Sequence, residues 1–426
     1  MSRLRSCVPC WLGLAAAVLV ALAATGVWNP VAPLWHLVAG PDLAGGGLLW
    51  QQRLDGAPRD LTLTGDVLVA EHRAHTEVRA LADGRRLWRD EVPWSAVGGD
   101  GADAVVVTGD RSGRGYLVRD PASGRHLREE RAAVAVWAYR DAVLDLACGA
   151  PADCALTAWP PRGSRPLWRV PVPAPDFALR GDHPRLRAPT PLGAEAGGPA
   201  PMPALLAVPA ADGTHVVDTL VGRLARTVPP ASGERVVAAG GRLLWLRAAA
   251  EGGACRGTVT ATDPAADPVA AAPTWQRADL DPRAARPGCA PADPVGAGNV
   301  LRAADGATAV LVDAHDGRDL WRGPGEPLAV DDRGALVREG GVLHAVAFGG
   351  AGGAGWRRPV GAAATAVLTP YAAVVADRAA GRVALLRPDT GQELRTLRSA
   401  AEVAAVGAHG VLLADGGDIG YARYSP

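Results

Sequence analysis

The residues whose type and spacing could hold a metal ion lie in the stretch EHRAHTE, residues 71–77. His72 and His75 stand three residues apart, with Glu71 and Glu77 at the two ends of the stretch. Imidazole and carboxylate groups are common ligands of zinc. Strand-like segments flank the stretch, so it predicts a hairpin whose alternate residues point to opposite faces, without the helix that would align two imidazoles. We therefore expect a solvated loop here and no metal site.

Other patterns that could carry chemistry are incomplete. The glycine-rich stretch GDRSGRG at 109–115 lacks the Lys-Ser/Thr end of a phosphate-binding loop, and two strands flank it instead of a strand and a helix. No Gly-x-Ser-x-Gly motif is present. His315 and His344 stand alone and are expected at the surface or between structural units. The sequence thus indicates no catalytic, cofactor-binding or metal-binding residue, and we expect no enzymatic activity and no cofactor.

Cys7 and Cys10 have the C-x-x-C spacing of redox and metal sites. No second pair accompanies them, and no strand followed by a helix surrounds them, so palmitoylation or the absence of a role is the favoured interpretation.

The composition favours a folded chain with many turns. Of its 426 residues, 48% are hydrophobic and 21% are charged, which is enough for a sizeable core. The 53 glycines and 36 prolines suit tight turns and disfavour long helices. The 44 basic residues balance 44 acidic residues without a long run of one sign. Nucleic acid is therefore not an expected partner.

The N-terminus predicts export. Residues 1–10 contain two arginines and precede an uncharged run at 11–28 that is just long enough to cross a bilayer as a helix. Basic residues on this side predict a cytoplasmic N-terminus, with the rest of the chain outside the cytoplasmic membrane. The favoured interpretation is an uncleaved anchor followed by a Pro/Gly-rich tether at 29–45. The alternative is a signal peptide cleaved near Ala23, which would give a secreted protein.

Four cysteines lie in the part of the chain that would face outward. Cys148 and Cys154 are close together, and Cys255 and Cys289 flank a long insertion. An even number of cysteines in an exported chain is typical of disulfides. Four cysteines allow three connectivities, and proximity favours the pairs Cys148–Cys154 and Cys255–Cys289.

A sequence motif is repeated along the rest of the chain. ADGRRLWR at 82–89 returns as HDGRDLWR at 315–322, and weaker copies contain short strand patterns, a Gly/Asp turn and then a tryptophan or a leucine. We call this last residue the hook. Hook spacings of about 35 to 56 residues are typical of solenoids, propellers or arrays. The nine hooks are Trp50, Trp88, Leu127, Trp168, Leu224, Trp275, Trp321, Trp356 and Leu394.

Four short strands in each unit favour a β-propeller over the helix pairs of α-solenoids. The sequence therefore predicts an all-β fold, a single propeller of four-stranded blades over residues 46–426. The Asp-Gly pairs supply tight turns. Each tryptophan hook is expected on the outermost strand, where its ring is buried between blades and its indole N–H binds a backbone acceptor.

The two ends of the propeller are expected to share one blade. Residues 402–424 offer three strands and no hook, whereas Trp50 lies on a hook strand with no blade before it. Joining them hides sheet edges that would otherwise pair with other chains. Counting every hook gives nine blades. Propellers of seven or eight blades are far more usual, and one weak hook, Leu224 or Trp356, is expected to be false. We therefore expect eight blades, with seven to nine allowed.

The phrase Asp-x-x-x-Gly-x-x-x-Trp, best seen at Asp313, Gly317 and Trp321, resembles the repeat of pyrroloquinoline-quinone-type propellers. A variant, Pro388-Asp389-Thr390-Gly391, precedes Leu394. The resemblance covers roughly residues 46–426. It implies a quinoprotein-like propeller, in a superfamily that includes quinone-dependent alcohol and glucose dehydrogenases and also non-enzymatic relatives, such as the lipoprotein that assists outer-membrane protein assembly.

The chain departs from the enzymes of this family in features that their redox reaction needs, which indicates a relative without that reaction. Quinone-dependent alcohol dehydrogenases carry a disulfide between adjacent cysteines and hold calcium with carboxylate and amide oxygens. This chain has no adjacent cysteines, and Asn29 and Asn299 are its only asparagines.

The function that we expect is therefore a membrane-anchored, extracytoplasmic binding or scaffold module for protein or cell-envelope ligands, without catalysis. The alternative is a quinone- or metal-dependent oxidoreductase that uses the central funnel. Insertions at 181–203 and 263–295 are expected as loops above the disc, where they are candidate contact sites or passive decoration.

Overall fold

The computed structural model describes residues 43–109, 114–150, 153–172, 186–192, 198–210, 212–230, 233–251, 254–265, 272–278, 285–286, 289–305, 308–349 and 354–425. The expected membrane segment at 11–28, most of the tether, and Cys7 and Cys10 lie outside these residues. No helix within the described ranges is long and apolar enough to cross a membrane.

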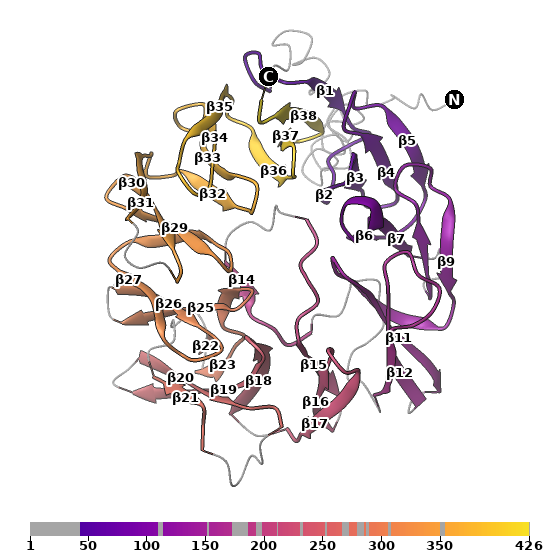
Figure 1. The fold of residues 1–426 in the computed structure, drawn as a ribbon, viewed down its shortest axis with the longest axis vertical. Coiled ribbons are helices and arrows are strands. Elements are labelled where there is room, and N and C mark those ends of the chain that lie inside the picture. Colours follow the sequence, from indigo (N-terminus) through magenta and orange to yellow (C-terminus); the bar gives the residue numbers. More distant parts are fainter. Residues whose placement is uncertain are drawn as a thin grey trace, which may run out of the picture.

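Nine sheets of the described chain are arranged as the blades of a ring (Figure 1). We number the blades in chain order and name their strands from the inner to the outer edge. Blade 1 consists of β2 (Asp60–Thr64), β3 (Val67–Glu71), β4 (Thr76–Ala80) and β5 (Arg86–Asp90). Blade 2 consists of β6 (Ser95–Gly98), β7 (Val105–Gly109), β8 (Tyr116–Arg119) and β9 (His126–Glu130), and contains the short 3-10 helix η1 (Gly101–Asp103). Blade 3 consists of β10 (Ala133–Ala138), β11 (Val143–Ala150), β12 (Asp153–Trp159) and β13 (Trp168–Pro171).

Blades 4 to 6 carry the irregular parts of the ring. Within the described residues, blade 4 consists of β15 (Leu205–Ala210), β16 (Gly213–Asp218) and β17 (Arg223–Val228). Blade 5 consists of β18 (Glu234–Ala239), β19 (Arg242–Glu251), β20 (Ala254–Thr262) and β21 (Trp275–Arg277). Blade 6 consists of β24 (Val295–Ala297), β25 (Val300–Asp305), β26 (Thr308–Asp313) and β27 (Asp319–Gly323), with β14 (Thr190–Pro191) added at its inner edge. A separate small hairpin pairs β22 (Ala285–Arg286) with β23 (Ala290–Pro291).

Blades 7 to 9 complete the ring. Blade 7 consists of β28 (Glu326–Val330), β29 (Gly334–Glu339), β30 (Val342–Ala347) and β31 (Ala354–Pro359). Blade 8 consists of β32 (Thr365–Leu368), β33 (Ala373–Asp377), β34 (Arg382–Leu386) and β35 (Glu393–Arg398). Blade 9 consists of β36 (Glu402–Val406), β37 (Gly410–Asp415) and β38 (Asp418–Arg423), and its outer strand is β1 (Trp50–Arg53). The predicted shared blade is confirmed, because β1 pairs antiparallel with β38.

The favoured number of eight blades is wrong, whereas nine lies at the edge of the expected range of seven to nine and equals the full count of hooks. Leu224 lies on β17 and Trp356 lies on β31, each on the outermost strand of its blade. The weak hook Leu224 is 37% exposed, yet its strand completes a separate sheet. A hook therefore marks the outer strand even where its side chain is poorly buried.

Five of the tryptophan hooks, Trp50, Trp88, Trp168, Trp275 and Trp356, pack on a turn glycine of the next blade. The indole N–H groups of four tryptophans donate to backbone carbonyls in the turn before the following blade's outer strand: Trp50 to Leu81 (2.7 Å), Trp88 to Pro121 (2.7 Å), Trp275 to Ala314 (3.2 Å) and Trp356 to Pro388 (3.0 Å). The glycine of that turn lies directly against the ring. At Gly222, which has a φ of +63°, an added Cβ would lie 2.2 Å from Cβ of Trp168. The Asp-Gly turn and the hook therefore recur together because one blade's turn receives the preceding blade's ring.

The hydrophobic core lies in layers between neighbouring blades. One layer joins Leu68 and Ala70 of blade 1 to Leu412 and Tyr421 of blade 9. Another joins Leu343 of blade 7 to Val375 and Leu386 of blade 8. Side chains from both sides of each sheet are thus removed from water, which explains the long apolar runs of the middle strands.

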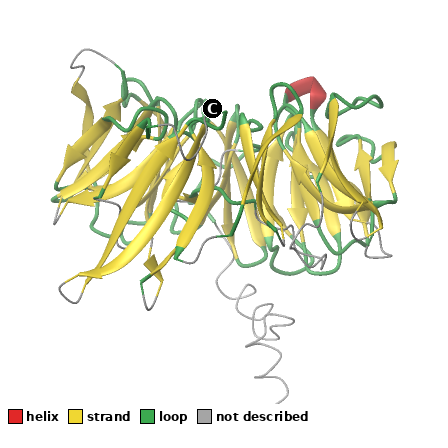
Figure 2. Ribbon diagram, turned by 90° about the horizontal axis from the view of Figure 1, so that it is seen from below, coloured by secondary structure: helices red, strands yellow, loops and turns green. Residues whose placement is uncertain are grey.

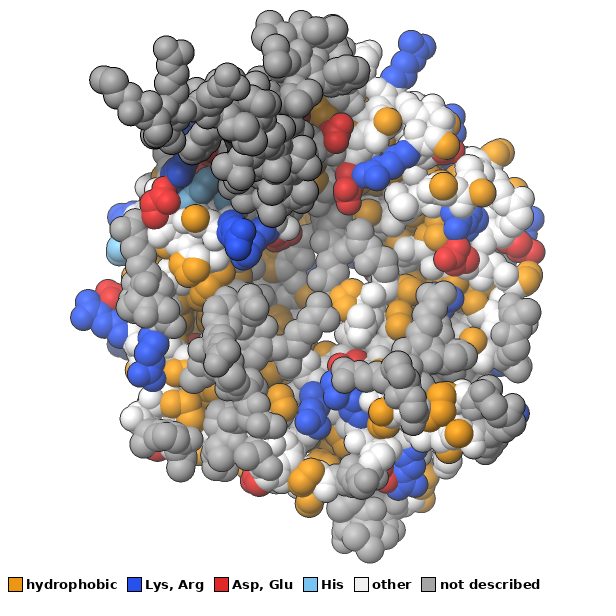
Figure 3. Space-filling model, turned by 180° about the vertical axis from the view of Figure 1, so that it is seen from behind, with side chains coloured by type: hydrophobic (Ala, Val, Ile, Leu, Met, Phe, Trp, Pro, Cys, Tyr) orange, Lys and Arg blue, Asp and Glu red, His pale blue; other side chains and the backbone are white. Residues whose placement is uncertain are grey.

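The ring is a disc with two distinct faces (Figure 2). The helix η1 and the C-terminus lie on one face, which we call the C-terminal face. The described chain begins at the opposite face, where Gly45 N–H donates to the carbonyl of Arg398 at the end of β35 (3.0 Å) and the Ser399 hydroxyl donates to the carbonyl of Leu43. We call this second face the entry face. Figure 3 shows the side of the disc that is turned away in Figure 1, and among its coloured side chains Arg and acidic residues are intermingled without a large patch of one sign.

Candidate functional site

Blade 4 lacks an inner strand among the described residues. The described residues before β15, 186–192 and 198–204, lie towards the middle of the ring instead (Figure 1). The N–H of Arg187 donates to Ala207 of β15 (2.9 Å), and Ala238 of β18 donates to the carbonyl of Arg187 (3.1 Å). β14 then pairs in parallel with β24 of blade 6. Residues 198–204 run from the middle of the ring to β15 (Figure 1). The described parts of the 181–203 insertion therefore contact the innermost described strands of three blades, β15, β18 and β24, and the expectation that they form a loop above the disc is wrong.

A cavity of about 540 Å³ lies beside this crossing segment on the C-terminal face. Gly198 and Pro199 form one wall. The other walls come from turns of blades 8, 9, 1, 2 and 3, at Tyr371, residues 406–409, residues 63–67, residues 100–104 and Arg140. Two residues of η1 line the cavity, which places its wall on the same face as the C-terminus (Figure 2). Cavities of this volume are typical of sites for small molecules or short peptide segments.

One ion pair fixes a wall of this cavity. Arg162 donates to Asp120 (2.6 Å) and to the carbonyl of Ala104 (3.0 Å), so it joins a turn of blade 3 to blade 2. Hydrogen bonds from Arg162 and Ser123 hold the pKa of Asp120 at about 2. Asp120 therefore stays ionised in this pair at any physiological pH.

Two other charged residues of the cavity, Asp66 and Arg140, are not held in an ion pair with another described residue. The side chains of Asp66 and Arg140 are exposed and make no hydrogen bond or ion pair with other described residues. A carboxylate and a guanidinium that share one cavity and lack mutual contacts are suited to a ligand that carries both charges. No group of three or more His, Cys, Asp or Glu side chains in the described part of the chain has the arrangement of a metal site.

The histidine pair expected in a solvated loop is buried, so that expectation is wrong. His72 and His75 are 4% and 7% exposed, and their rings stack with centroids 4.2 Å apart. Burial, together with neighbouring His72 and Arg89, lowers the pKa of His75. The stretch is still a hairpin, because the N–H of His72 donates to the carbonyl of His75 (2.8 Å).

A buried carboxylate explains why the rings turn inward. Glu77 has no exposed surface and accepts two hydrogen bonds from Arg79 (3.0 and 3.3 Å). His72 Nε2 lies 3.8 Å from Glu77 Oε1. Burial alone would raise the pKa of Glu77, but the adjacent His72 ring and the Arg79 guanidinium lower it to about 2. Because its oxygens are occupied by Arg79, Glu77 serves as the centre of a charge cluster and is poorly placed as a metal ligand.

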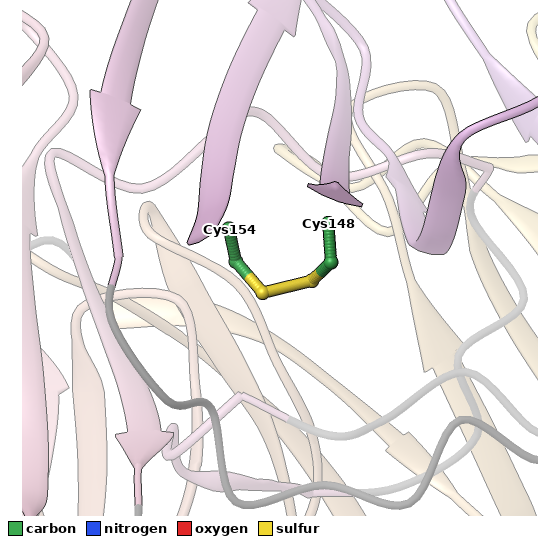
Figure 4. The surroundings of a disulfide bond; sticks show 2 residues. All are labelled: Cys148 and Cys154. Atoms are coloured by element: carbon green, nitrogen blue, oxygen red, sulfur yellow. A yellow bond between two sulfur atoms is a disulfide. The ribbon is translucent and has the colours of Figure 1, made fainter. Parts of the chain in front are cut away.

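The cysteines form the two pairs that proximity favoured. Cys148 and Cys154 face each other across β11 and β12 (Figure 4), with an S–S distance of 2.05 Å. Cys255 and Cys289, 2.01 Å apart at sulfur, connect β20 to the second insertion. An ion pair between Arg235 and Asp293 (2.7 Å) holds the same insertion against blade 5. The Cys255–Cys289 disulfide and the Arg235–Asp293 ion pair therefore hold the second insertion, 263–295, to the disc.

The remaining residues singled out by the sequence have structural surroundings. His315 lies between blades 5 and 6, where its Nδ1 is 3.0 Å from the carbonyl of Gly240. His344 lies on β30, and Gly109 of the glycine-rich stretch ends β7, whereas residues 110–113 lie outside the described chain. None of these residues lines the 540 Å³ cavity.

Comparison with known proteins gives similarity of structure only. No family model matches the chain, and no curated protein matches it. Among solved structures, the computationally designed Ika8 protein is 15% identical, with a TM-score of 0.41 over 89% of this chain and 100% of its own. BamB from Moraxella catarrhalis is 13% identical, with a TM-score of 0.37 over 87% of this chain and 97% of its own. A quinohemoprotein alcohol dehydrogenase from Comamonas testosteroni is 12% identical, with a TM-score of 0.38 over 89% of this chain and 76% of its own. With TM-scores below 0.5, these similarities assign no function to the chain.

Proposed function

We propose that the protein is a membrane-anchored, extracytoplasmic propeller that binds a protein or cell-envelope ligand in the cavity of its C-terminal face, without catalysing a reaction on it. The observation that carries this proposal is the cavity itself, about 540 Å³ in volume, with the uncommitted charges of Asp66 and Arg140 in its wall. Fixed turns and the ion pair between Arg162 and Asp120 give the rest of the wall a preformed surface, which lowers the entropic cost of binding.

The path of the chain supports an orientation for this binding face. The described chain begins at the entry face, where Leu43 and Gly45 are held at the end of blade 8. An anchor at 11–28, joined through the tether, would therefore hold the entry face towards the membrane. The cavity would then open away from the membrane, towards partners in the envelope or outside the cell.

A photo-crosslinking experiment in membranes of the source cells tests the proposal. We expect p-benzoylphenylalanine at position 371 to crosslink to a partner, because Tyr371 is 42% exposed and lines the cavity. The matched control carries the same group at Arg378, which lies after β33 at the opposite end of the same blade. Crosslinking from position 371 that is abolished by Arg140→Glu, with none from position 378, would support the proposal. Equal crosslinking from both positions would contradict it.

A further inference from the structure

The cavity wall contains a short proline-rich segment of the chain itself. Residues 198–203 read Gly-Pro-Ala-Pro-Met-Pro, with proline at every second position. Proline has no backbone N–H and fixes φ, so this alternation favours an extended chain with few backbone donors. Only Ala200 and Met202 keep an N–H group between the prolines.

The propeller holds this segment through its backbone. The N–H of Arg140 donates to the carbonyl of Ala200 (2.8 Å), and Asp141 Oδ1 accepts from the N–H of Met202 (2.7 Å). The hydroxyl of Thr219 donates to the carbonyl of Pro203 (2.7 Å). These three groups lie on turns of blades 3 and 4, and we call them the backbone clamp. The clamp binds backbone groups of an extended segment and forms these hydrogen bonds whatever the segment's side chains are.

The segment covers one side of the cavity and leaves the rest open. The side chains of Ala200, Pro201 and Pro203 are exposed, so little apolar burial holds the segment in place. Beyond Pro199 the cavity continues to Arg140 and Asp66. A peptide that took over the backbone clamp would therefore also bring its neighbouring charged side chains to these two residues.

We propose that the C-terminal face binds an extended, proline-rich segment of a partner protein, and that residues 198–203 are an internal occupant of the same clamp. This inference rests on the proposed function and specifies the class of its ligand. The internal segment competes at the high effective concentration of a tethered ligand. The partner binds by displacing it, and its own acidic and basic side chains then reach Arg140 and Asp66.

The test uses the full chain in detergent and a fluorescent hexapeptide of sequence Gly-Pro-Ala-Pro-Met-Pro, with binding followed by anisotropy. A variant with Pro199→Gly, Pro201→Gly and Pro203→Gly loosens the internal segment and leaves the clamp intact. We expect this variant to bind the peptide roughly ten-fold or more tightly than the unaltered chain, because three prolines no longer restrain the competitor. Adding Asp141→Ala to it should reverse the gain, since the acceptor for the peptide N–H is lost.

Two further measurements keep the proposal open to refutation. A hexapeptide with alanine in place of each proline should bind more weakly. In the unaltered chain, saturating peptide should speed hydrogen exchange at the N–H of Met202, a readout that does not depend on the folding of the variant. The proposal is overturned if the loosened variant shows no saturable binding at millimolar peptide, if both peptides bind equally, or if the loosened variant self-associates through the clamp in place of binding peptide. Crosslinking from position 371 without peptide binding would remove this inference and leave the proposed function standing.

Discussion

Replacing Gly222 by alanine is expected to lower the free energy of unfolding by about 2–5 kcal/mol. The new Cβ would lie 2.2 Å from Cβ and 2.4 Å from Cγ of Trp168, so the hook of blade 3 would have to move. The alanine must also adopt a φ of +63°, which L side chains rarely adopt. The midpoint of chemical denaturation measures the loss.

The matched control for Gly222 is Gly381→Ala. Gly381 has a φ of +59°, and nothing lies within 4 Å of the position of its Cβ. This variant pays only for the backbone conformation, about 1–2 kcal/mol. If both variants lose the same stability, the contact between turn and hook does not hold neighbouring blades together.

Replacing Glu77 by glutamine is expected to destabilise the protein by about 3–5 kcal/mol, because it leaves a buried charge without its partner. Glu77 is fully buried, and the side chain of Arg79, which it pairs with, is 9% exposed. Arg86 lies 3.7 Å from the same carboxylate but keeps Asp55 as a partner at 3.4 Å, so Arg79 is the guanidinium that loses its counterion. Thermal and chemical unfolding of the variant and the unaltered chain should both show the loss.

Glu402→Gln provides the comparison for Glu77. Glu402 also pairs with an arginine, Arg378 at 3.1 Å, but the two side chains are 71% and 58% exposed. An exposed ion pair contributes about 0–1 kcal/mol. A loss at Glu77 as small as the loss at Glu402 would show that the buried charge cluster of blade 1 is not needed for stability.

The architecture could be predicted because the repeated motif contains two features that the fold uses together, a turn glycine and a hook. In five copies a turn glycine stands two to four residues before a hook, and this glycine receives the preceding hook; the five are Gly84, Gly124, Gly222, Gly317 and Gly391. The exact blade number was missed because Leu224 and Trp356 looked too weak to mark outer strands. In the structure, Trp356 packs on Gly391 and donates to the carbonyl of Pro388 like the stronger hooks.

The candidate site could not be predicted, because its wall is assembled from turns that are distant in sequence. Asp66, Arg140 and Tyr371 each occupy an ordinary turn, and only ring closure brings them to one cavity. The path of residues 198–203 was missed for a related reason. A Pro/Ala/Gly-rich stretch is typical of an exposed loop, and nothing local shows that turns of blades 3 and 4 hold its backbone.

The burial of His72 and His75 could not be predicted from the local sequence pattern either. The hairpin itself was predicted from flanking strand patterns. Glu77 and Arg79 lie two residues apart and share one face of β4, and their buried ion pair sets the environment into which the imidazoles turn. Such a cluster depends on packing against neighbouring chain segments, which spacing alone does not reveal.

In the proposed function the propeller binds its ligand without a redox cofactor. Titration of the full chain with pyrroloquinoline quinone and calcium, followed by melting temperature and absorbance, tests it most directly. A ligand that binds only the native state must raise the melting temperature. We expect no shift at millimolar ligand. A saturable rise, together with the absorbance of bound quinone, would contradict the claim and favour an oxidoreductase.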